Sequence, residues 1–258
     1  MTWSKPITTV FFAITIVALM FTYKYHTKIA EAPQSVHAWR QADCASQALN
    51  YSKPGASFFK PEILCLLSGH NTSGYCMEEF PIIYYFVGIL HRTFGHIDLL
   101  FRLTILSSFL IGLYSLLHLY RKLIADNFWS YGLTILLFTA PVIVFYANNY
   151  LLNIPALSAT IIAWLLFFLF IKNKKELYLV ASIILLTFAA LLKISELISL
   201  CTLCGILFLD YFKIIRFNET GSLFTRPYRL AAYIALSFAA VFAWYYYSHW
   251  YNNHYGQT

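Results

Sequence analysis

Long uninterrupted apolar runs are the feature of this sequence that most restricts its fold. The stretches 151–171 and 177–192 contain no charged residue, and runs of similar length recur along the chain. A helix of about 20 residues crosses the ~30 Å hydrocarbon core of a bilayer, because each residue adds about 1.5 Å. Strands of a membrane barrel would instead alternate apolar and polar residues. The sequence therefore predicts an all-α, polytopic membrane protein.

The composition excludes a water-soluble globule. Hydrophobic residues make up 60% of the chain, charged residues only 11%, and the mean hydropathy is +0.63, whereas a soluble domain is about a quarter charged. The 18 Lys and Arg exceed the 11 Asp and Glu, as in many nucleic-acid-binding proteins. These basic residues lie between apolar runs, where they are topology signals, so no nucleic-acid partner is expected.

Charge placement predicts which apolar segments cross the bilayer. Three short basic loops, at 121–122, 172–175 and 213–229, belong on the cytoplasmic side. Two apolar segments separate neighbouring basic loops, but three separate Lys5 from the first, so one of the three does not cross. The segment 80–95 is the weakest, because it is short and rich in interfacial aromatic residues. About seven transmembrane helices follow, at 7–23, 98–120, 128–147, 150–171, 177–192, 195–212 and 228–247.

This topology divides the chain into four parts. Residues 1–23 form the first helix, favoured over a cleaved signal peptide because the apolar run is long and a polar segment follows it. Residues 24–97 form a large extracytoplasmic loop with amphipathic and interfacial helices. Six further transmembrane helices occupy 98–247, and 248–258 form an external tail. We expect a multi-pass protein of the inner (plasma) membrane whose active face is extracytoplasmic.

The large loop contains most of the candidate chemistry. The segment 35–49 predicts an amphipathic helix with Ser35 as its N-cap, and this helix places Arg40, Asp43 and Gln47 on one face. A surface ion pair between Arg40 and Asp43 is the simplest interpretation. Acids are scarce in this loop, however, which makes each of them a functional candidate: Glu31, Asp43, Glu62, Glu78 and Glu79.

Further candidates lie at the boundaries of the predicted membrane segments. Glu78 and Glu79 come just before Pro81, where adjacent acids beside lipid are costly unless they are solvated or used. Lys193 and Glu196 are three residues apart near the outer ends of two helices. Either these two side chains pair with each other, or Lys193 receives an anionic group.

Cysteines and histidines give weaker signals. An oxidising compartment would allow a disulfide between Cys65 and Cys76 and would leave Cys44 as a thiol. The pair Cys201-x-x-Cys204 lies in an apolar run and is interpreted as packing. The eight histidines show no metal-ligand spacing. No metal site is therefore predicted, although a requirement for a divalent cation is left open.

Several short motifs follow one another in a fixed order along nearly the whole chain. They are His37-Ala38-Trp39-Arg40-Gln41-Ala42-Asp43, Gln47-Ala48-Leu49-Asn50-Tyr51, Phe59-x-Pro61, Glu79-Phe80-Pro81-Ile82-Ile83-Tyr84-Tyr85, Gly95, Arg102-Leu103, Pro141, Leu152-Asn153-Ile154-Pro155-Ala156-Leu157 and Leu191-Leu192-Lys193. This series resembles the N-terminal module of bacterial GT-C membrane glycosyltransferases. It is similar to the protein O-mannosyltransferases and the lipid A aminoarabinose transferase.

The resemblance implies transfer of a sugar from a polyprenyl-phosphate carrier to a lipid, glycan or protein acceptor. An essential acid lies in the first external loop of that family, and Asp43 occupies the matching position as candidate general base of an inverting reaction. Glu79 is a second candidate catalytic acid. Arg40 and Lys193 are candidates to stabilise the leaving phosphate. Further candidate substrate-binding residues are Glu78, Asn153 and His37, although His37 also suits a plain surface position.

The chain departs from that family in two respects. Many relatives have Asp where this chain has Asn153, so a second acid at that position is replaced by a hydrogen-bonding amide. Relatives also continue into further spans, whereas this sequence ends at Thr258, so we expect a truncated chain or one without its acceptor-binding half. Two alternatives to an enzyme stay open, a transporter or flippase-like protein and a non-catalytic assembly partner.

Overall fold

The computed structural model describes residues 5–66, 72–124, 126–215, 222–224 and 226–255. Within these ranges the regular structure is helical, and the one antiparallel bridge pair joins Glu62 to Tyr75. The predicted all-α class is confirmed. Residues 1–4 of the predicted first helix, Arg216 of the third basic loop and residues 256–258 of the predicted tail lie outside the described residues.

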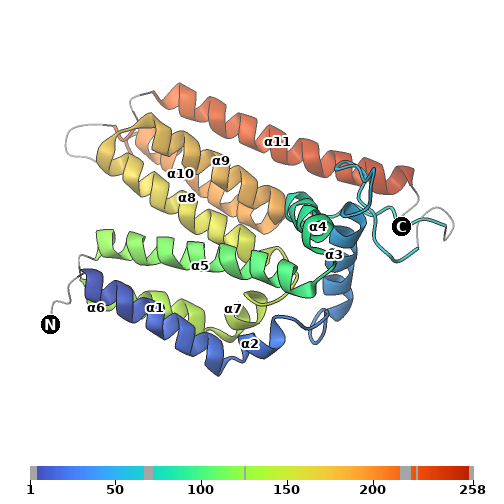
Figure 1. The fold of residues 1–258 in the computed structure, drawn as a ribbon. Helices are drawn as coiled ribbons and strands as arrows, with labels where there is room; N and C mark the ends of the chain where they lie inside the picture. The colour runs from blue at the N-terminus through green and yellow to red at the C-terminus, as the bar shows by residue number, and fades with distance from the viewer. Residues whose placement is uncertain (1–4, 67–71, 125, 216–221, 225, 256–258) are drawn as a thin grey trace.

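Long helices lie side by side along a common direction and form the body of the molecule (Figure 1). The pairs α8 with α9 and α5 with α8 make the most extensive contacts between helices. Close approach at α5–α8 depends on Gly112, since a Cβ built there would lie 2.7 Å from the Ser158 side chain. The helices of this body are α1 (Lys5–Thr22), α5 (Asp98–Leu123), α6 (Asn127–Thr139), α8 (Asn153–Asn173), α9 (Glu176–Leu192), α10 (Leu197–Tyr211) and α11 (Pro227–His254).

Four helical stretches in the described residues are long and apolar enough to cross a membrane: α5, α8, residues 194–211 and α11. The third combines a 3-10 turn, Ile194–Glu196, with α10. Apolar helices too short for that criterion are Pro6–Thr22, Ile82–Phe94 and Glu176–Leu192. The predicted count of seven spans therefore stays a prediction.

The predicted span 128–147 is not one helix. It divides into α6 and the short α7 (Pro141–Tyr146), with Ala140 between them in an extended conformation. Proline has no N–H to donate and disfavours a helical conformation in the residue before it, so the break falls where the sequence places Pro141. This prediction of a continuous helix is wrong.

Large apolar side chains remain exposed on the long helices. Examples are Ile14 on α1, Ile111 on α5 and Leu236 on α11, with exposed fractions of 59%, 59% and 70%. A water-soluble bundle would bury such side chains, whereas a bilayer solvates them. The exposed apolar surface fits association of this helical body with lipid.

Three shorter helices gather at one end of the body (Figure 1). They are α2 (Tyr25–Lys28), α3 (Ala38–Tyr51) and α4 (Ile82–Phe94). The predicted N-cap Ser35 is wrong, because α3 begins after His37 without a side-chain cap and Ser35 has a left-handed φ of 67°. The α4 helix occupies the segment that the charge argument singled out as too weak to cross.

The described residues of the basic loops lie at the opposite end of the body. In Figure 1, α1 begins at the left of the body. The last residues of α5, α8 and α10 and the first residues of α6, α9 and α11 lie on that same side of the picture. Arg121, Lys174 and Arg226 therefore lie together at that end, away from α3 and α4. The charge argument predicts that the basic loops share one side of the membrane, and this stays a prediction.

Candidate functional site

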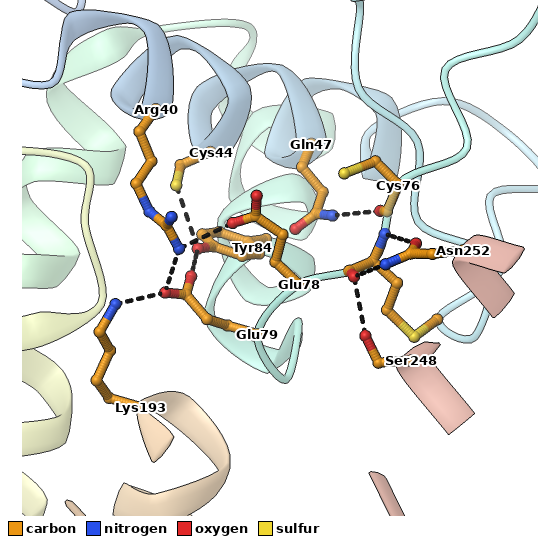
Figure 2. A network of polar contacts seen from close by, with 11 residues as sticks. Arg40, Cys44, Gln47, Cys76, Glu78, Glu79, Tyr84, Lys193, Ser248 and Asn252 are labelled. Carbon is orange, nitrogen blue, oxygen red and sulfur yellow. Dashed lines mark hydrogen bonds and ion pairs between the residues drawn. The ribbon is translucent and has the colours of Figure 1, made fainter. Parts of the chain in front are cut away.

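A buried carboxylate, Glu79, is the centre of a polar cluster between α3 and α9 (Figure 2). Only 8% of Glu79 is exposed. Its Oε1 accepts hydrogen bonds from Arg40 Nη2 at 2.9 Å and from Lys193 Nζ at 3.1 Å. Its Oε2 accepts one from the Tyr84 hydroxyl at 2.6 Å. Two cations and a hydroxyl thus satisfy the acid, as burial of a charge requires.

Separate elements supply the partners of Glu79. Arg40 comes from α3, Tyr84 from α4, and Lys193 from the residue that follows α9. Lys193 is extended, with φ −151° and ψ 117°, so the chain leaves the helical direction there. The backbone N–H of Phe80 donates to the carbonyl of Leu191 at 3.2 Å and fixes the acid segment against the end of α9.

Arg40 joins both adjacent acids. Its Nη2 lies 2.8 Å from Glu78 Oε2 and 2.9 Å from Glu79 Oε1. Burial alone would lower the pKa of Arg40, but the two carboxylates outweigh it and raise that pKa, so the guanidinium stays charged. Burial raises the pKa of Glu78, which Arg40 partly opposes. The predicted cations and the predicted acid pair therefore meet in one site.

Asp43 lies one turn of α3 beyond Arg40 and is half-buried. Among the described residues, Asp43 forms no ion pair with Arg40, because Arg40 reaches Glu78 and Glu79 instead. Burial raises the pKa of the Asp43 carboxyl, and the charge of Arg40 opposes that shift. Asp43 and Glu78 both line a niche of about 20 Å³ that also meets Cys44, Gln47 and Tyr84. That volume is enough for about one water molecule.

Sequence reasoning missed two members of the cluster, Tyr84 and Cys44. The Tyr84 hydroxyl lies 3.2 Å from Cys44 Sγ and donates to Glu79. Burial raises the pKa of Cys44 to about 12, so this thiol stays protonated and is no nucleophile at neutral pH. One signal was present in the sequence, since a tyrosine in an apolar helix needs a partner for its hydroxyl.

Other candidates lie apart from the cluster. His37 is exposed at the start of α3, and Asn153 is the first residue of α8. The alternative ion pair between Lys193 and Glu196 does not form, because Lys193 binds Glu79 and Glu196 accepts from Thr160 Oγ1 at 2.8 Å. Cys65 is exposed and Cys76 buried, and the structure does not join them in a disulfide.

The C-terminal helix contacts the same loop. The backbone of Met77 accepts hydrogen bonds from Ser248 Oγ at 2.8 Å and Asn252 Nδ2 at 2.7 Å, and its N–H donates to Asn252 Oδ1 at 2.9 Å. Met77 directly precedes the two acids in the sequence, and Ser248 and Asn252 lie near that segment in Figure 2. On the other side, Gln47 Nε2 donates to the carbonyl of Cys76 at 3.3 Å. The acid segment is thus held between α3 and α11.

The cluster can bind an anion or move a proton. Its cations, Arg40 and Lys193, converge on one carboxylate oxygen, and Asp43 and Glu78 hold carboxyls of raised pKa beside them. Across the part of the chain that the structure describes, no group of three His, Cys, Asp or Glu is arranged to hold a metal ion.

The arrangement defines a helical protein with four candidate membrane-spanning stretches and a charged cluster where α3 and α4 pack against the ends of longer helices. No protein-family model, curated protein or solved structure matches this chain.

Proposed function

We propose that this protein is a membrane glycosyltransferase that moves a sugar from a polyprenyl-phosphate carrier to an acceptor at the extracytoplasmic face. The supporting observation is that Arg40 and Lys193 both bind Glu79. Asp43 lies one turn of α3 beyond Arg40. The ordered motifs that resemble GT-C enzymes contain these residues. The acceptor is a lipid, a glycan or a protein. The long helices lie in the lipid bilayer.

Asp43 is the general base in this proposal. Its carboxylate takes the proton of the acceptor O–H while the acceptor oxygen forms a bond to the anomeric carbon. The bond from that carbon to the phosphate oxygen breaks, and the polyprenyl phosphate leaves with the electron pair. Attack from the face opposite the leaving group inverts the configuration of the anomeric carbon. Asp43 suits the role better than Glu79, whose oxygens already accept three hydrogen bonds.

Arg40 and Lys193 stabilise the charge that grows on the leaving phosphate. Glu79 is a positioning residue, because it holds both cations in place before a donor arrives. Glu78 lies at the exposed edge of the cluster, and its side chain is 46% exposed. It competes with Glu79 for the guanidinium of Arg40. Since two side-chain cations supply positive charge, we expect transfer to persist when divalent metal is removed with EDTA.

The direct test measures transfer from a panel of labelled polyprenyl-phosphate sugars in membranes that contain the full chain. We expect Asp43→Asn to lose at least about 100-fold in transfer, in the range that general-base catalysis contributes. Glu62→Gln is the matched control, because it removes a carboxylate from the same loop but from outside the cluster. Both variants should insert and purify as the wild type does.

Full activity in Asp43→Asn would remove the catalytic assignment. If wild-type membranes transfer no sugar from any donor of the panel, the glycosyltransferase proposal fails. Uptake or release of a labelled lipid by the same membranes would then favour the transporter alternative. Co-purification of a second membrane protein would favour the assembly partner.

A further inference from the structure

A second cavity lies apart from the Glu79 cluster and shares none of its residues. Its volume is about 520 Å³, and it opens between α2, the first turns of α5, and α7. Its apolar lining includes Pro141, Val144 and Phe145. Gln41 also lines it, although its neighbour Arg40 belongs to the cluster. The cavity and the cluster are therefore separate sites that share one helix.

The cavity contains a buried cation, Arg102, that is only 4% exposed. Arg102 Nη1 donates to the carbonyl of Asn148 at 2.7 Å, and Nη2 donates to that of Ala32 at 3.2 Å. Its guanidinium carbon lies 4.8 Å from the centroid of the Tyr150 ring. These neutral groups orient Arg102 but bring no negative charge.

No carboxylate in the described residues forms an ion pair with Arg102. Glu31, shortly after α2, pairs with Lys28 at 2.9 Å and accepts from Gln34. Lys28 lowers the pKa of Glu31, and the charge of Arg102 contributes to that shift. Asp98 lies one helical turn before Arg102 on α5, and the described residues show no ion pair between the two. A buried guanidinium that has no ion pair is costly and is a functional feature by default in a membrane protein. Guanidinium groups in such places commonly receive carboxylate or phosphate.

Three residues that line this cavity have buried polar atoms without hydrogen-bond partners. They are Arg102 Nε, Asn148 Oδ1 and Asn149 Nδ2. Asn148 is 7% exposed and Asn149 1%. Buried polar groups are nearly always satisfied, so three partnerless atoms on residues that line one cavity indicate a missing polar ligand. Two of the three are donors, which favours an anion.

We infer that this cavity binds the phosphate group of an anionic ligand, with Arg102 and Asn149 as its recognition residues. Phosphate fits both observations, because it brings negative charge for Arg102 and accepts hydrogen bonds from a guanidinium and an amide. The apolar side chains of α7 at the cavity suit the acyl chains of a phospholipid. This inference is independent of the glycosyl transfer proposed for the cluster.

The first experiment uses the purified full chain in a nonionic detergent. Thermal unfolding is followed during titration with dioctanoyl phosphatidic acid, inorganic phosphate, or dioctanoylglycerol, which has the same chains without phosphate. A rise in the unfolding temperature with phosphatidic acid alone identifies a lipid headgroup site. A rise with inorganic phosphate as well identifies a site for phosphate itself. An equal response to dioctanoylglycerol, or no response to any of the three, would overturn the inference.

A single substitution separates binding from folding. Asn149 Oδ1 accepts from the backbone N–H of Leu151 at 2.8 Å, and Asn149→Asp keeps that acceptor. The partnerless Nδ2 becomes a carboxylate oxygen in the cavity lining that also contains Arg102, where it replaces the ligand charge. We expect at least about tenfold weaker phosphatidic acid binding, with an unliganded unfolding temperature equal to or above that of the wild type.

Asn253→Asp, at the exposed end of α11, is the matched control. It makes the same chemical change away from the cavity, so its binding should equal that of the wild type. Unchanged binding in Asn149→Asp would exclude the proposed contact. If that variant unfolds at a lower temperature, Arg102→Lys provides the second test. It keeps the positive charge but loses the paired N–H donors of the guanidinium. Unaltered affinity in both variants would sink the inference.

Discussion

The acidic side chains of the cluster differ in how many hydrogen bonds and ion pairs they form with other side chains. Glu79 is fully engaged by Arg40, Lys193 and Tyr84, whereas Asp43 faces a niche and has no ion pair in the described residues. An acid that holds two cations organises charge, and an acid with unused acceptor capacity exchanges protons. In the proposed mechanism the two candidate catalytic acids therefore take different roles.

The pKa of Asp43 gives a prediction for the pH dependence of transfer. Burial raises that pKa, with Arg40 in opposition, so the base is protonated at a pH where an ordinary aspartate is still ionised. Transfer should fall as the pH decreases through the raised pKa, with a midpoint above the ordinary pKa of an aspartate. A pH–rate profile of wild-type membranes measures that midpoint. Asp43→Glu should keep an acid limb, and an identical limb in Asp43→Asn would assign it to another group.

Glu79→Gln tests the positioning role. The amide can still accept one hydrogen bond, but Arg40 and Lys193 lose the charge that they share. We expect a loss of about 2 kcal/mol in the free energy of unfolding, less than for a fully buried pair because both cations are partly exposed. Denaturant unfolding in detergent gives this value.

A double-mutant cycle separates the pair from other effects of the substitution. Lys193→Met should cost less in the Glu79→Gln background than in the wild type, since its partner charge is already gone. Equal costs in the two backgrounds would show that Glu79 and Lys193 are not coupled.

The sequence predicted most residues of the site but not their partners. Scarcity of acids singled out Glu78 and Glu79, and a boundary position singled out Lys193. The simplest interpretation of the spacing pairs Arg40 with Asp43 three residues away, but Arg40 binds acids 38 and 39 residues further along the chain. Local spacing cannot reveal such pairs, because they depend on how α3, α4 and α9 pack.

At the scale of helices, the contact between α3 and α4 positions the site. A Cβ at Gly88 would lie 2.6 Å from Tyr51 Cβ and 2.9 Å from the carbonyl oxygen of Ala48. Gly88→Ala should therefore push the two helices apart and cost about 1–3 kcal/mol, detected as a lower unfolding temperature. Transfer should fall with it, because Tyr84 and Arg40 move apart.

Gly132→Ala is the control for that prediction. A Cβ there would meet nothing within 4 Å, so alanine should stabilise α6 by up to about 1 kcal/mol. If Gly88→Ala unfolded at the same temperature as Gly132→Ala, the close α3–α4 contact would not be required.

Helix positions were more predictable than helix continuity. Uninterrupted apolar runs correctly located α5, α8, α10 and α11, because lipid-facing helices need apolar residues all round. The same criterion missed the break at Pro141, since the apolar run continues through it. Hydropathy indicates which segments prefer lipid to water. The helix break at this position is indicated by the proline alone.

For the whole molecule, the two ends of the helical body should lie on opposite sides of the membrane. Ala42 and Lys175 are exposed at opposite ends, and the exposed native thiols Cys65 and Cys201 can be replaced by serine. In that background, Ala42→Cys should react with an impermeant thiol reagent on intact cells. Lys175→Cys should react only after lysis. The reverse pattern would place the cluster in the cytoplasm and reject an extracytoplasmic glycosyltransferase.

Orientation could be argued from sequence because Lys and Arg mark one side, and the structure gathers those loops at one end of the body. The number of crossings could not be fixed in the same way. Helices α1 and α9 have 18 and 17 residues, so about 27 Å and about 26 Å of helix meet a hydrocarbon core of ~30 Å. Only contact with lipid decides whether such helices tilt, thin the bilayer or stop short.

The attachment of α11 to Met77 makes the cluster sensitive to mechanical displacement. Ser248 and Asn252 bind the residue directly before Glu78, while Lys193 directly follows a different helix, α9. Any sliding of α11 along α9 would pull the acids relative to the lysine and open or shorten the salt bridge. A shift of α11 would therefore change the distances between the acids and Lys193. Lateral pressure from the membrane that moved α11 would have the same effect.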